Sequence, residues 1–271
     1  MFLRKIPYTV LEKKNAANGG DGKEHPMEHF LDTVETIPEG FGFPALGAVH
    51  LVWLAALGAF IAGSVVIYRQ LDADRRRKLR RLYAALLLLN ELFKMVCLTV
   101  GGNYLLKYLP VHLCSINIFV IAFHAWKPVR AVGDYLYLVC IPAAAAALLF
   151  PTWATLPLAN FMVWHSFTVH ALLVAYPLML TVGGDIRPRL KNIPRSLLVL
   201  AGLGLVALAV NLLLDTNFMF LMYAEPGTPF VFFEEALGHY ITGFFVLVPL
   251  VLAVMMLPIL LTDAKRRRAG V

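Results

Sequence analysis

Seven long apolar segments dominate this 271-residue chain and restrict what it can fold into. An α-helix needs about 20 apolar residues to cross the hydrocarbon core of a bilayer. Because lipid offers no hydrogen-bond partners for the backbone, such segments are expected to cross it as helices. Charged residues make up 15% of the chain, against about 25% in soluble domains. The predicted spans are residues 44–68, 82–100, 108–126, 132–150, 157–182, 196–214 and 240–261.

The basic residues predict which way the bundle faces. Lys and Arg number seven in 69–81, two in 127–131, four in 183–195 and four after 261, whereas the loops between them hold only Lys107. Short basic loops favour the cytoplasmic face. We therefore predict an all-α bundle of seven transmembrane helices, with the N-terminus outside and the C-terminus in the cytoplasm. The same pattern explains the net charge of +7, so nucleic-acid binding is not needed to account for it. We expect the protein to lie in a bacterial cell membrane.

Polar segments flank the membrane domain. The sequence divides into a polar tail over 1–43, the seven-helix domain over 44–262 and a basic cytoplasmic tail over 263–271. In the first tail, a short amphipathic helix is predicted between Pro26 and Pro38. We interpret it as an interfacial anchor, with a lid over an outward-facing lipid entrance as the alternative. Its apolar face would consist of Met27, Phe30, Leu31, Val34 and Ile37.

Charged residues inside a span are costly, and the second span holds two of them. Glu91 and Lys94 are three residues apart, so they share one helix face next to Asn90. We predict a structural ion pair inside the bundle. A role in proton transfer would require one of the two to be unpaired.

The third span carries a cysteine among polar residues. Cys114 and Asn117 share a face, and His112 precedes them on another. A buried cysteine often serves only as a small hydrophobe, but a polar surrounding can support a thiolate. The other two cysteines, Cys97 and Cys140, lie in apolar runs, and an odd number argues against a disulfide framework.

Two further spans contain polar residues. In the fifth, Ser166 and His170 share a face and His165 lies on another. One histidine can be structural and the other a general base, since the imidazole pKa lies near neutrality. The sixth ends with Asn211 and Asn217, whose amides are candidate donors to a substrate carbonyl. Asp215 and Asn217 fit helix-end and turn chemistry equally well.

These residue types together favour acyl transfer. A cysteine activated by a histidine would form a thioester, and amide side chains would hold the oxyanion. Metal binding by His112, Cys114, His165 and His170 is the alternative, but their spacing matches no metal motif, so we expect no metal and no cofactor.

Several segments, in this order, resemble a known family. They are GAVHLVWL with His50, LPVHLCSI, HALLVAYPLMLTVGGDIRP and NLLLDTNFMFL, spread over about residues 40 to 262. They are similar to the bacterial YwaF integral membrane family and the related transmembrane protein 164 family. Near the last helix the chain departs from the expected tryptophan-proline-tyrosine element and has LGHY, with His239 and Tyr240.

The resemblance implies a seven-helix fold and an activity that moves fatty acyl chains between phospholipids. It places the essential cysteine on Cys114 and the essential histidine on His170. We expect His112, Asn117, His165, Ser166, Asn211 and Asn217 to support them, with membrane lipids as environment and substrate. The competing hypothesis is a non-catalytic lipid- or small-molecule-binding protein, a transporter or a sensor. The sequence leaves the acyl donor, the acceptor and the oligomeric state open.

Overall fold

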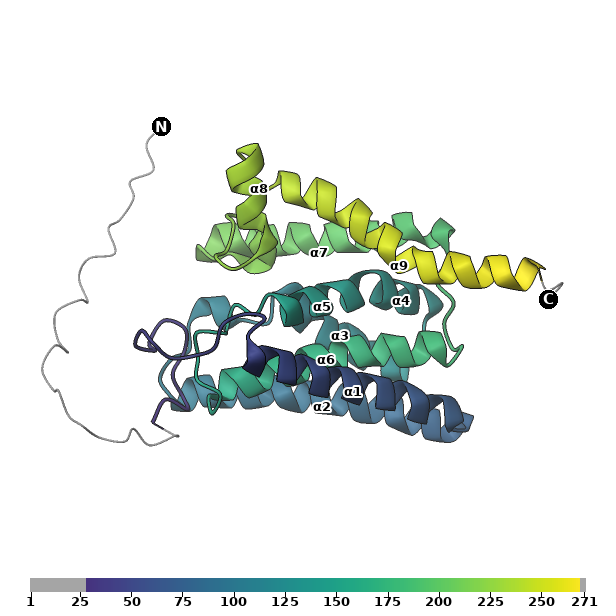
Figure 1. Cartoon of the computed structure of the whole chain (residues 1–271), viewed down its shortest axis with the longest axis horizontal. Helices are drawn as coiled ribbons and strands as arrows, with labels where there is room; N and C mark the ends of the chain where they lie inside the picture. The colour runs from purple at the N-terminus through teal and green to yellow at the C-terminus, as the bar shows by residue number, and fades with distance from the viewer. Residues whose placement is uncertain (1–27, 269–271) are drawn as a thin grey trace, which may run out of the picture.

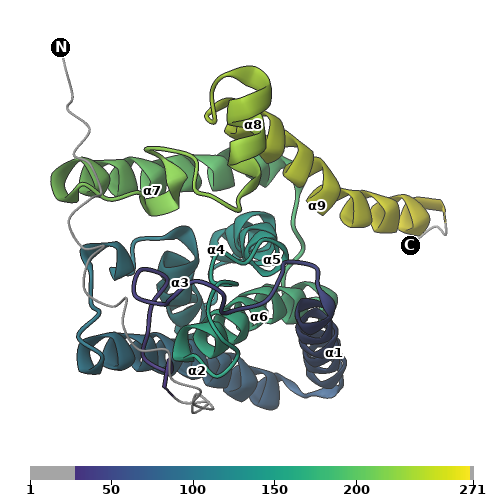
Figure 2. The ribbon, with the colours of Figure 1, turned by 60° about the vertical axis from the view of Figure 1, so that its left-hand side comes forward.

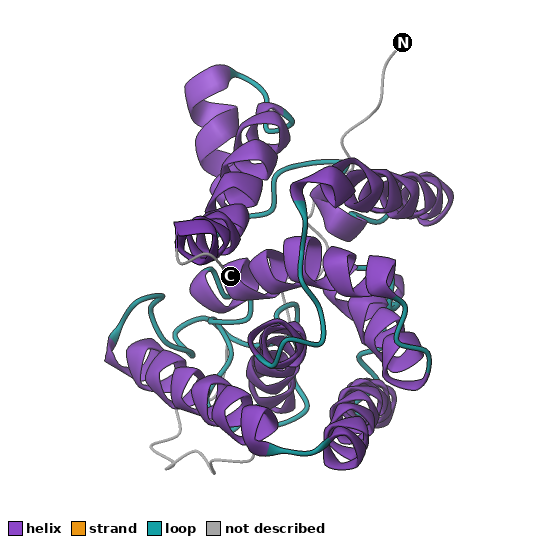
Figure 3. Ribbon diagram, turned by 90° about the vertical axis from the view of Figure 1, so that its right-hand side faces the viewer, coloured by secondary structure: helices purple, strands orange, loops and turns teal. Residues whose placement is uncertain are grey.

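The computed structural model describes residues 28–268 and contains helices and loops but no strand in that range (Figures 1 and 3). Seven of its helical segments are long and apolar enough to cross a membrane, which confirms the predicted all-α polytopic fold. The orientation of the termini stays a prediction. The helices are α1 (Ala48–Gln70), α2 (Ala73–Val100), α3 (Leu113–Trp126), α4 (Arg130–Tyr135), α5 (Ile141–Leu149), α6 (Phe161–Val182), α7 (Ile193–Leu214), α8 (Pro229–Leu237) and α9 (Thr242–Arg268).

Helix α6 forms the centre of the bundle. It contacts α1, α2, α3 and α5, which surround it (Figure 2). Most of its side chains are buried, as expected of a central helix, and Phe161, Phe167 and Tyr176 are fully buried. The polar residues His165, Ser166 and His170 are held inside the protein, away from lipid.

Helices α7 and α9 form an outer layer on the α4 and α5 side of the bundle (Figures 1 and 2). Many of their large apolar side chains face outward, including Leu213 at 82% exposure and Phe245 at 77%. In a membrane these side chains contact lipid and need no protein partner. The outer layer therefore presents a lipid-facing surface.

The second span begins earlier than predicted. The basic run that we placed in a loop over 69–81 mostly lies in the first turns of α2, and only Leu71 and Asp72 connect α1 to α2. Asp72 caps the helix by accepting a hydrogen bond from the Arg75 backbone N–H at 2.8 Å. Arg and Lys are good helix formers, so nothing interrupts the helix before the apolar segment. We call this end of the bundle, where α2 begins and α6 ends, the basic end.

Prolines shape the third and fourth spans. Pro110 disfavours helix at the preceding residue, and the third span divides into a 3₁₀ turn at Leu106–Tyr108 and the short α3. The fourth span widens into a π-helix at Leu136–Cys140 between α4 and α5. Pro142 lacks the N–H that would bond to the Leu138 carbonyl, and its ring crowds that carbonyl, so the helix takes up an extra residue there.

The described part of the N-terminal tail, residues 28–43, forms turns, so the predicted short helix is wrong; Met27 lies outside the described residues. The turns cover the end of the bundle where α2 ends and α6 begins, which we call the cap end. Asn160 Nδ2 donates to the carbonyls of His29 and Asp32 at 2.8 Å, and Asn103 Nδ2 donates to Leu31 O at 2.9 Å. These carbonyls accept hydrogen bonds from side chains of the bundle, whereas in a helix they would accept them from backbone N–H groups.

Candidate active site

A buried ion pair lies at the centre of a polar cluster inside the bundle. Lys94 Nζ donates to Glu91 Oε1 at 2.6 Å, and both side chains are only 8% exposed. This is the pair that their spacing predicts. The charge of Lys94 is within electrostatic range of His112, His165 and His170. The ion pair of α2 therefore lies close to the histidines at the start of α3 and within α6. We name this group the central cluster: Glu91, Lys94, His112, Cys114, Asn117, Tyr135, Trp153, His165 and His170.

His165 connects α6 to the ion pair. Its Nδ1 lies 3.1 Å from the Asn90 backbone oxygen and 2.8 Å from Asn90 Oδ1. A carbonyl oxygen only accepts, so Nδ1 carries the proton of the neutral ring and Nε2 is the acceptor. Nε2 lies 3.9 Å from Glu91 Oε2, an oxygen that is buried without a hydrogen-bond partner in the described structure. In this tautomer His165 lies next to the Glu91–Lys94 pair but does not supply the donor that Glu91 Oε2 lacks.

His170 has the tautomer that a general base requires. Its Nδ1–H donates to the carbonyl oxygen of Ser166 at 2.6 Å, and the ring stacks on Trp153 with centroids 5.2 Å apart and planes 7° from parallel. With the proton on Nδ1, the lone pair on Nε2 is the basic site. The predicted Ser166–His170 relationship exists, but it uses the Ser166 backbone and not its hydroxyl. Two fixed contacts therefore hold the ring in one orientation.

Cys114 lies in the first turn of α3. It is half-buried, whereas Cys97 and Cys140 are buried. Cys114 precedes the basic-end terminus of α3 by twelve residues, and His170 precedes that of α6 by twelve residues. Helices α3 and α6 contact each other, and His124 Nδ1 of α3 lies 2.9 Å from the Tyr176 hydroxyl of α6. Among the described residues, however, no hydrogen bond joins Cys114 to His170.

Unpartnered polar atoms concentrate in the central cluster. In the described part of the chain, seven buried side-chain nitrogen and oxygen atoms have no hydrogen-bond partner, and five of them belong to Glu91, Asn117, Tyr135 and Trp153. The Tyr135 hydroxyl is within electrostatic range of the Cys114 and Cys140 sulfurs. An unpaired buried polar group costs about 1–3 kcal/mol, so proteins retain few of them. Their concentration here is typical of a site that a ligand completes.

His112 is held by the loop that follows α7. Its ring packs edge-on against Phe218 at a centroid distance of 5.0 Å, and Nδ1 accepts a hydrogen bond from the Met219 N–H at 3.4 Å. His112 precedes the first residue of α3. It therefore anchors the start of that helix, and with it the position of Cys114.

The two amides of the sixth span close turns. Asn211 Oδ1 accepts from the Phe218 N–H at 2.7 Å, and its Nδ2 donates to Phe218 O at 3.0 Å. Asn217 Oδ1 accepts from the Met222 N–H at 3.0 Å, and Asp215 caps α7 in a left-handed conformation. The structure has the turn chemistry considered for this segment, in which both amide nitrogens already donate to backbone carbonyls, of Phe218 and Tyr223. The Tyr240 hydroxyl also binds this loop, because it donates to Leu221 O at 2.7 Å.

Sequence reasoning missed Tyr135 and Trp153. Tyr135 lies within an apolar span at the start of the π-helix, and Trp153 lies in the loop before α6. Neither residue has a polar neighbour at helical spacing that would mark it. Only packing reveals them, because both meet the cluster through tertiary contacts. Among the described residues, no group of three or more His, Cys, Asp or Glu side chains is placed to hold a metal ion.

Comparison with known proteins gives one match. A family model described as the TMEM164 family matches residues 45–259, which include all of the central cluster. No curated protein and no solved structure matches the chain.

Proposed function

Because the chain belongs to the TMEM164 family, we propose that it is a membrane acyltransferase that moves fatty acyl chains between phospholipids through a thioester on Cys114. The resemblance assigns the essential cysteine and histidine to Cys114 and His170. The observation that supports the proposal is that α3, which holds Cys114, contacts α6, which holds His170. The unpartnered donors of Asn117 and Tyr135 belong to the same cluster.

The first half of the reaction transfers the acyl group to the protein. His170 Nε2 takes the Cys114 proton, and the thiolate attacks the ester carbonyl of the donor phospholipid. The C–S bond forms as the carbonyl electrons move to oxygen. Asn117 Nδ2 and the Tyr135 hydroxyl are the donors we assign to that oxyanion. Collapse of the intermediate breaks the C–O bond, and the lysophospholipid oxygen leaves with the proton from His170.

The second half reverses these steps with a different lipid. The hydroxyl of a lysophospholipid gives its proton to His170 Nε2 and attacks the thioester carbonyl. The new ester bond forms, the C–S bond breaks, and the thiolate recovers the proton. Because Cys114 and His170 form no hydrogen bond in the described structure, proton transfer requires the two side chains to approach when lipid binds, as in many enzymes.

A lipid product assay tests this function. Purified protein in liposomes would be supplied with a phosphatidylcholine that carries an isotope-labelled acyl chain and with an unlabelled lysophospholipid. Mass spectrometry should find the labelled chain on the acceptor with the native protein and not with Cys114→Ala. Cys97→Ala is the matched control, since Cys97 is buried and lies outside the central cluster; Cys140 is unsuitable because it is close to Tyr135.

The competing function is a non-catalytic lipid- or small-molecule-binding protein. The missing hydrogen bond between Cys114 and His170 favours it, as does the paired state of Glu91 and Lys94. On this reading the unpartnered groups of Asn117 and Tyr135 would bind a ligand that does not react. If no labelled acceptor forms although labelled lipid binds in a Cys114-independent manner, this second function replaces the first.

A further inference from the structure

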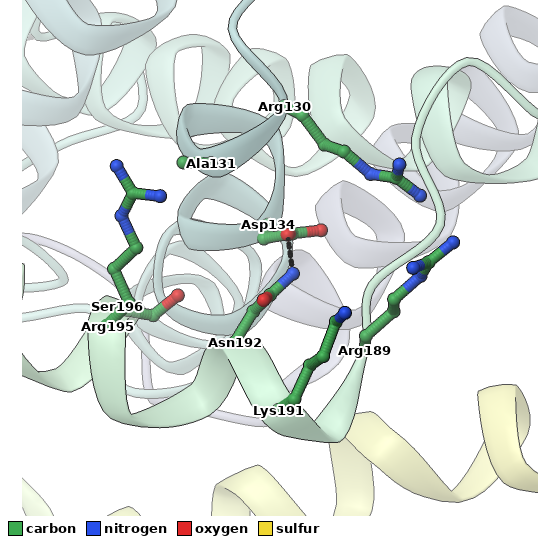
Figure 4. A pocket seen from close by; sticks show the side chains of 8 residues that line it. All are labelled: Arg130, Ala131, Asp134, Arg189, Lys191, Asn192, Arg195 and Ser196. Carbon is green, nitrogen blue, oxygen red and sulfur yellow. Dashed lines mark hydrogen bonds between the residues drawn. The ribbon is translucent and has the colours of Figure 1, made fainter.

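A basic pocket opens between the starts of α4 and α7, at the basic end of the bundle and away from the central cluster. Its volume is about 230 Å³. Figure 4 shows its side chains arranged around the carboxylate of Asp134. The residues that line it and carry charge are Arg130, Asp134, Arg189, Lys191 and Arg195.

The four cations of the pocket are only partly balanced by the protein, because Asp134 is the one carboxylate of the described chain that lines it and interacts electrostatically with Arg130, Arg189 and Arg195. Among the described side chains, none of Arg130, Arg189, Lys191 and Arg195 comes within 4 Å of a carboxylate oxygen. The cations Arg76 and Arg80 at the same end differ, because both form ion pairs with Asp185, at 2.9 Å and 3.1 Å. Four cations around one carboxylate leave an excess of positive charge, so an anion that enters the cavity is stabilised.

Asp134 provides a second, independent indication of a ligand. It is 1% exposed. One of its oxygens accepts a hydrogen bond from Asn192 Nδ2, while Oδ1 is buried without a partner in the described structure. A buried carboxylate oxygen that lines a pocket requires a donor. The ligand should therefore carry a hydroxyl or an ammonium group besides its negative charge.

The position of the pocket indicates a lipid. Two membrane-spanning segments, Arg130–Leu149 and Leu190–Leu214, begin beside it, so it lies at the level where the chain leaves the hydrocarbon core. Exposed apolar side chains adjoin it on α7, with Leu198 at 74% and Val199 at 45% exposure. Basic pockets between transmembrane helices commonly bind lipid head groups.

We propose that this pocket binds the phosphate of an anionic phospholipid whose head group also donates a hydrogen bond to Asp134. Phosphatidylglycerol has both features. Its phosphate would bind to Arg130, Arg189 and Arg195, and a glycerol hydroxyl would reach Asp134 Oδ1. Its acyl chains would lie along α7. The site is separate from Cys114, so the proposal stands whether or not the protein transfers acyl groups.

Native mass spectrometry of the purified full chain in detergent tests the site. Phosphatidylglycerol, phosphatidylcholine and inorganic phosphate would be titrated separately. Phosphatidylglycerol should bind most tightly. Each Arg near a membrane surface contributes to the free energy of binding an anionic lipid. Arg130→Gln with Arg195→Gln should therefore weaken phosphatidylglycerol binding roughly thirtyfold.

The matched control removes two charges elsewhere at the same end. Arg77→Gln with Lys78→Gln changes exposed residues of α2 that do not line the pocket, and it should alter phosphatidylglycerol binding less than about twofold. Equal weakening by both double variants would overturn the site, because it would show that only overall charge matters. Inorganic phosphate binding as tightly as phosphatidylglycerol would overturn the lipid as its source, and equal binding of phosphatidylcholine would overturn the preference for an anion.

Discussion

His170 donates from Nδ1 to the Ser166 carbonyl oxygen at 2.6 Å, which leaves Nε2 as the basic nitrogen of the ring. His170→Asn separates the structural role of this residue from its chemical role, because the asparagine amide can still donate to Ser166 but cannot act as a base. We expect a loss of acyl transfer of about 10²- to 10⁴-fold. The melting temperature in detergent should stay close to that of the native protein. Near-native transfer rates in His170→Asn would exclude His170 as the base.

Asn117 should show opposite effects on stability and on activity. Its amide is fully buried and has no hydrogen-bond partner in the described structure. Asn117→Leu replaces it with an apolar group of similar size and removes a desolvation cost of about 1–3 kcal/mol. Thermal melting should therefore show equal or greater stability, while acyl transfer falls about 10²- to 10³-fold through loss of an oxyanion donor.

Asn211 is the matched control for this substitution. It is equally buried, but its amide bonds to both backbone groups of Phe218. Asn211→Leu should therefore lower the melting temperature. If Asn117→Leu is destabilised as strongly as Asn211→Leu, the Asn117 amide has a structural partner and is no oxyanion donor.

The Glu91–Lys94 pair should contribute to stability only as a pair. Removing one charge leaves the other buried and unpaired, which costs about 3–5 kcal/mol. Glu91→Gln should lower the melting temperature sharply, and Glu91→Gln combined with Lys94→Met should recover part of the loss. A single variant that melts like the native protein would show that water reaches the pair.

The turns that cover the cap end should lose hydrogen-exchange protection at acid pH. Burial raises the pKa of the Glu35 carboxyl, but hydrogen bonds from Lys107 and Tyr108 outweigh this and hold its pKa below the ordinary value of 4.5. A carboxyl with a lowered folded pKa stabilises the fold above its unfolded pKa, and the contribution is lost as pH falls through the folded pKa. Hydrogen-exchange protection of residues 28–37 should therefore decrease below about pH 4.5.

Two variants check this assignment. Glu35→Gln should lower the protection of residues 28–37 at neutral pH and remove most of its pH dependence. Glu39→Gln changes an exposed carboxyl in the same segment and should have little effect. Protection that is independent of pH in the native protein would contradict the role of Glu35.

The sequence predicted those features that depend on residue spacing and on the cost of burying charge. Apolar runs separated by basic loops indicated the seven spans, and the three-residue interval indicated the Glu91–Lys94 pair. Features that depend on tertiary contacts could not be read in this way. The turns at 28–43 depend on Asn103 and Asn160, which lie far along the chain. Tyr135 joins the cluster only because α4 packs against α3.

The helix ends were harder to predict from the sequence, and the reason is local. The basic residues before the second apolar segment suit both a loop and a helix, and the cap at Asp72 decides for the helix. The widening at Leu136–Cys140 follows from Pro142, but a proline in an apolar run is equally consistent with a kink.

The central claim is that Cys114 carries the acyl group, and detection of a protein thioester tests it most directly. Purified protein would be incubated with a phospholipid that bears a labelled acyl chain, without an acceptor, and the intact protein would be weighed by mass spectrometry. The native chain and Cys97→Ser should gain the mass of one acyl chain, located on Cys114 and released by neutral hydroxylamine. Cys114→Ser should form no thioester, and His170→Asn should acquire label far more slowly. Full lipid turnover by Cys114→Ser, or label on a residue other than Cys114, would contradict the account.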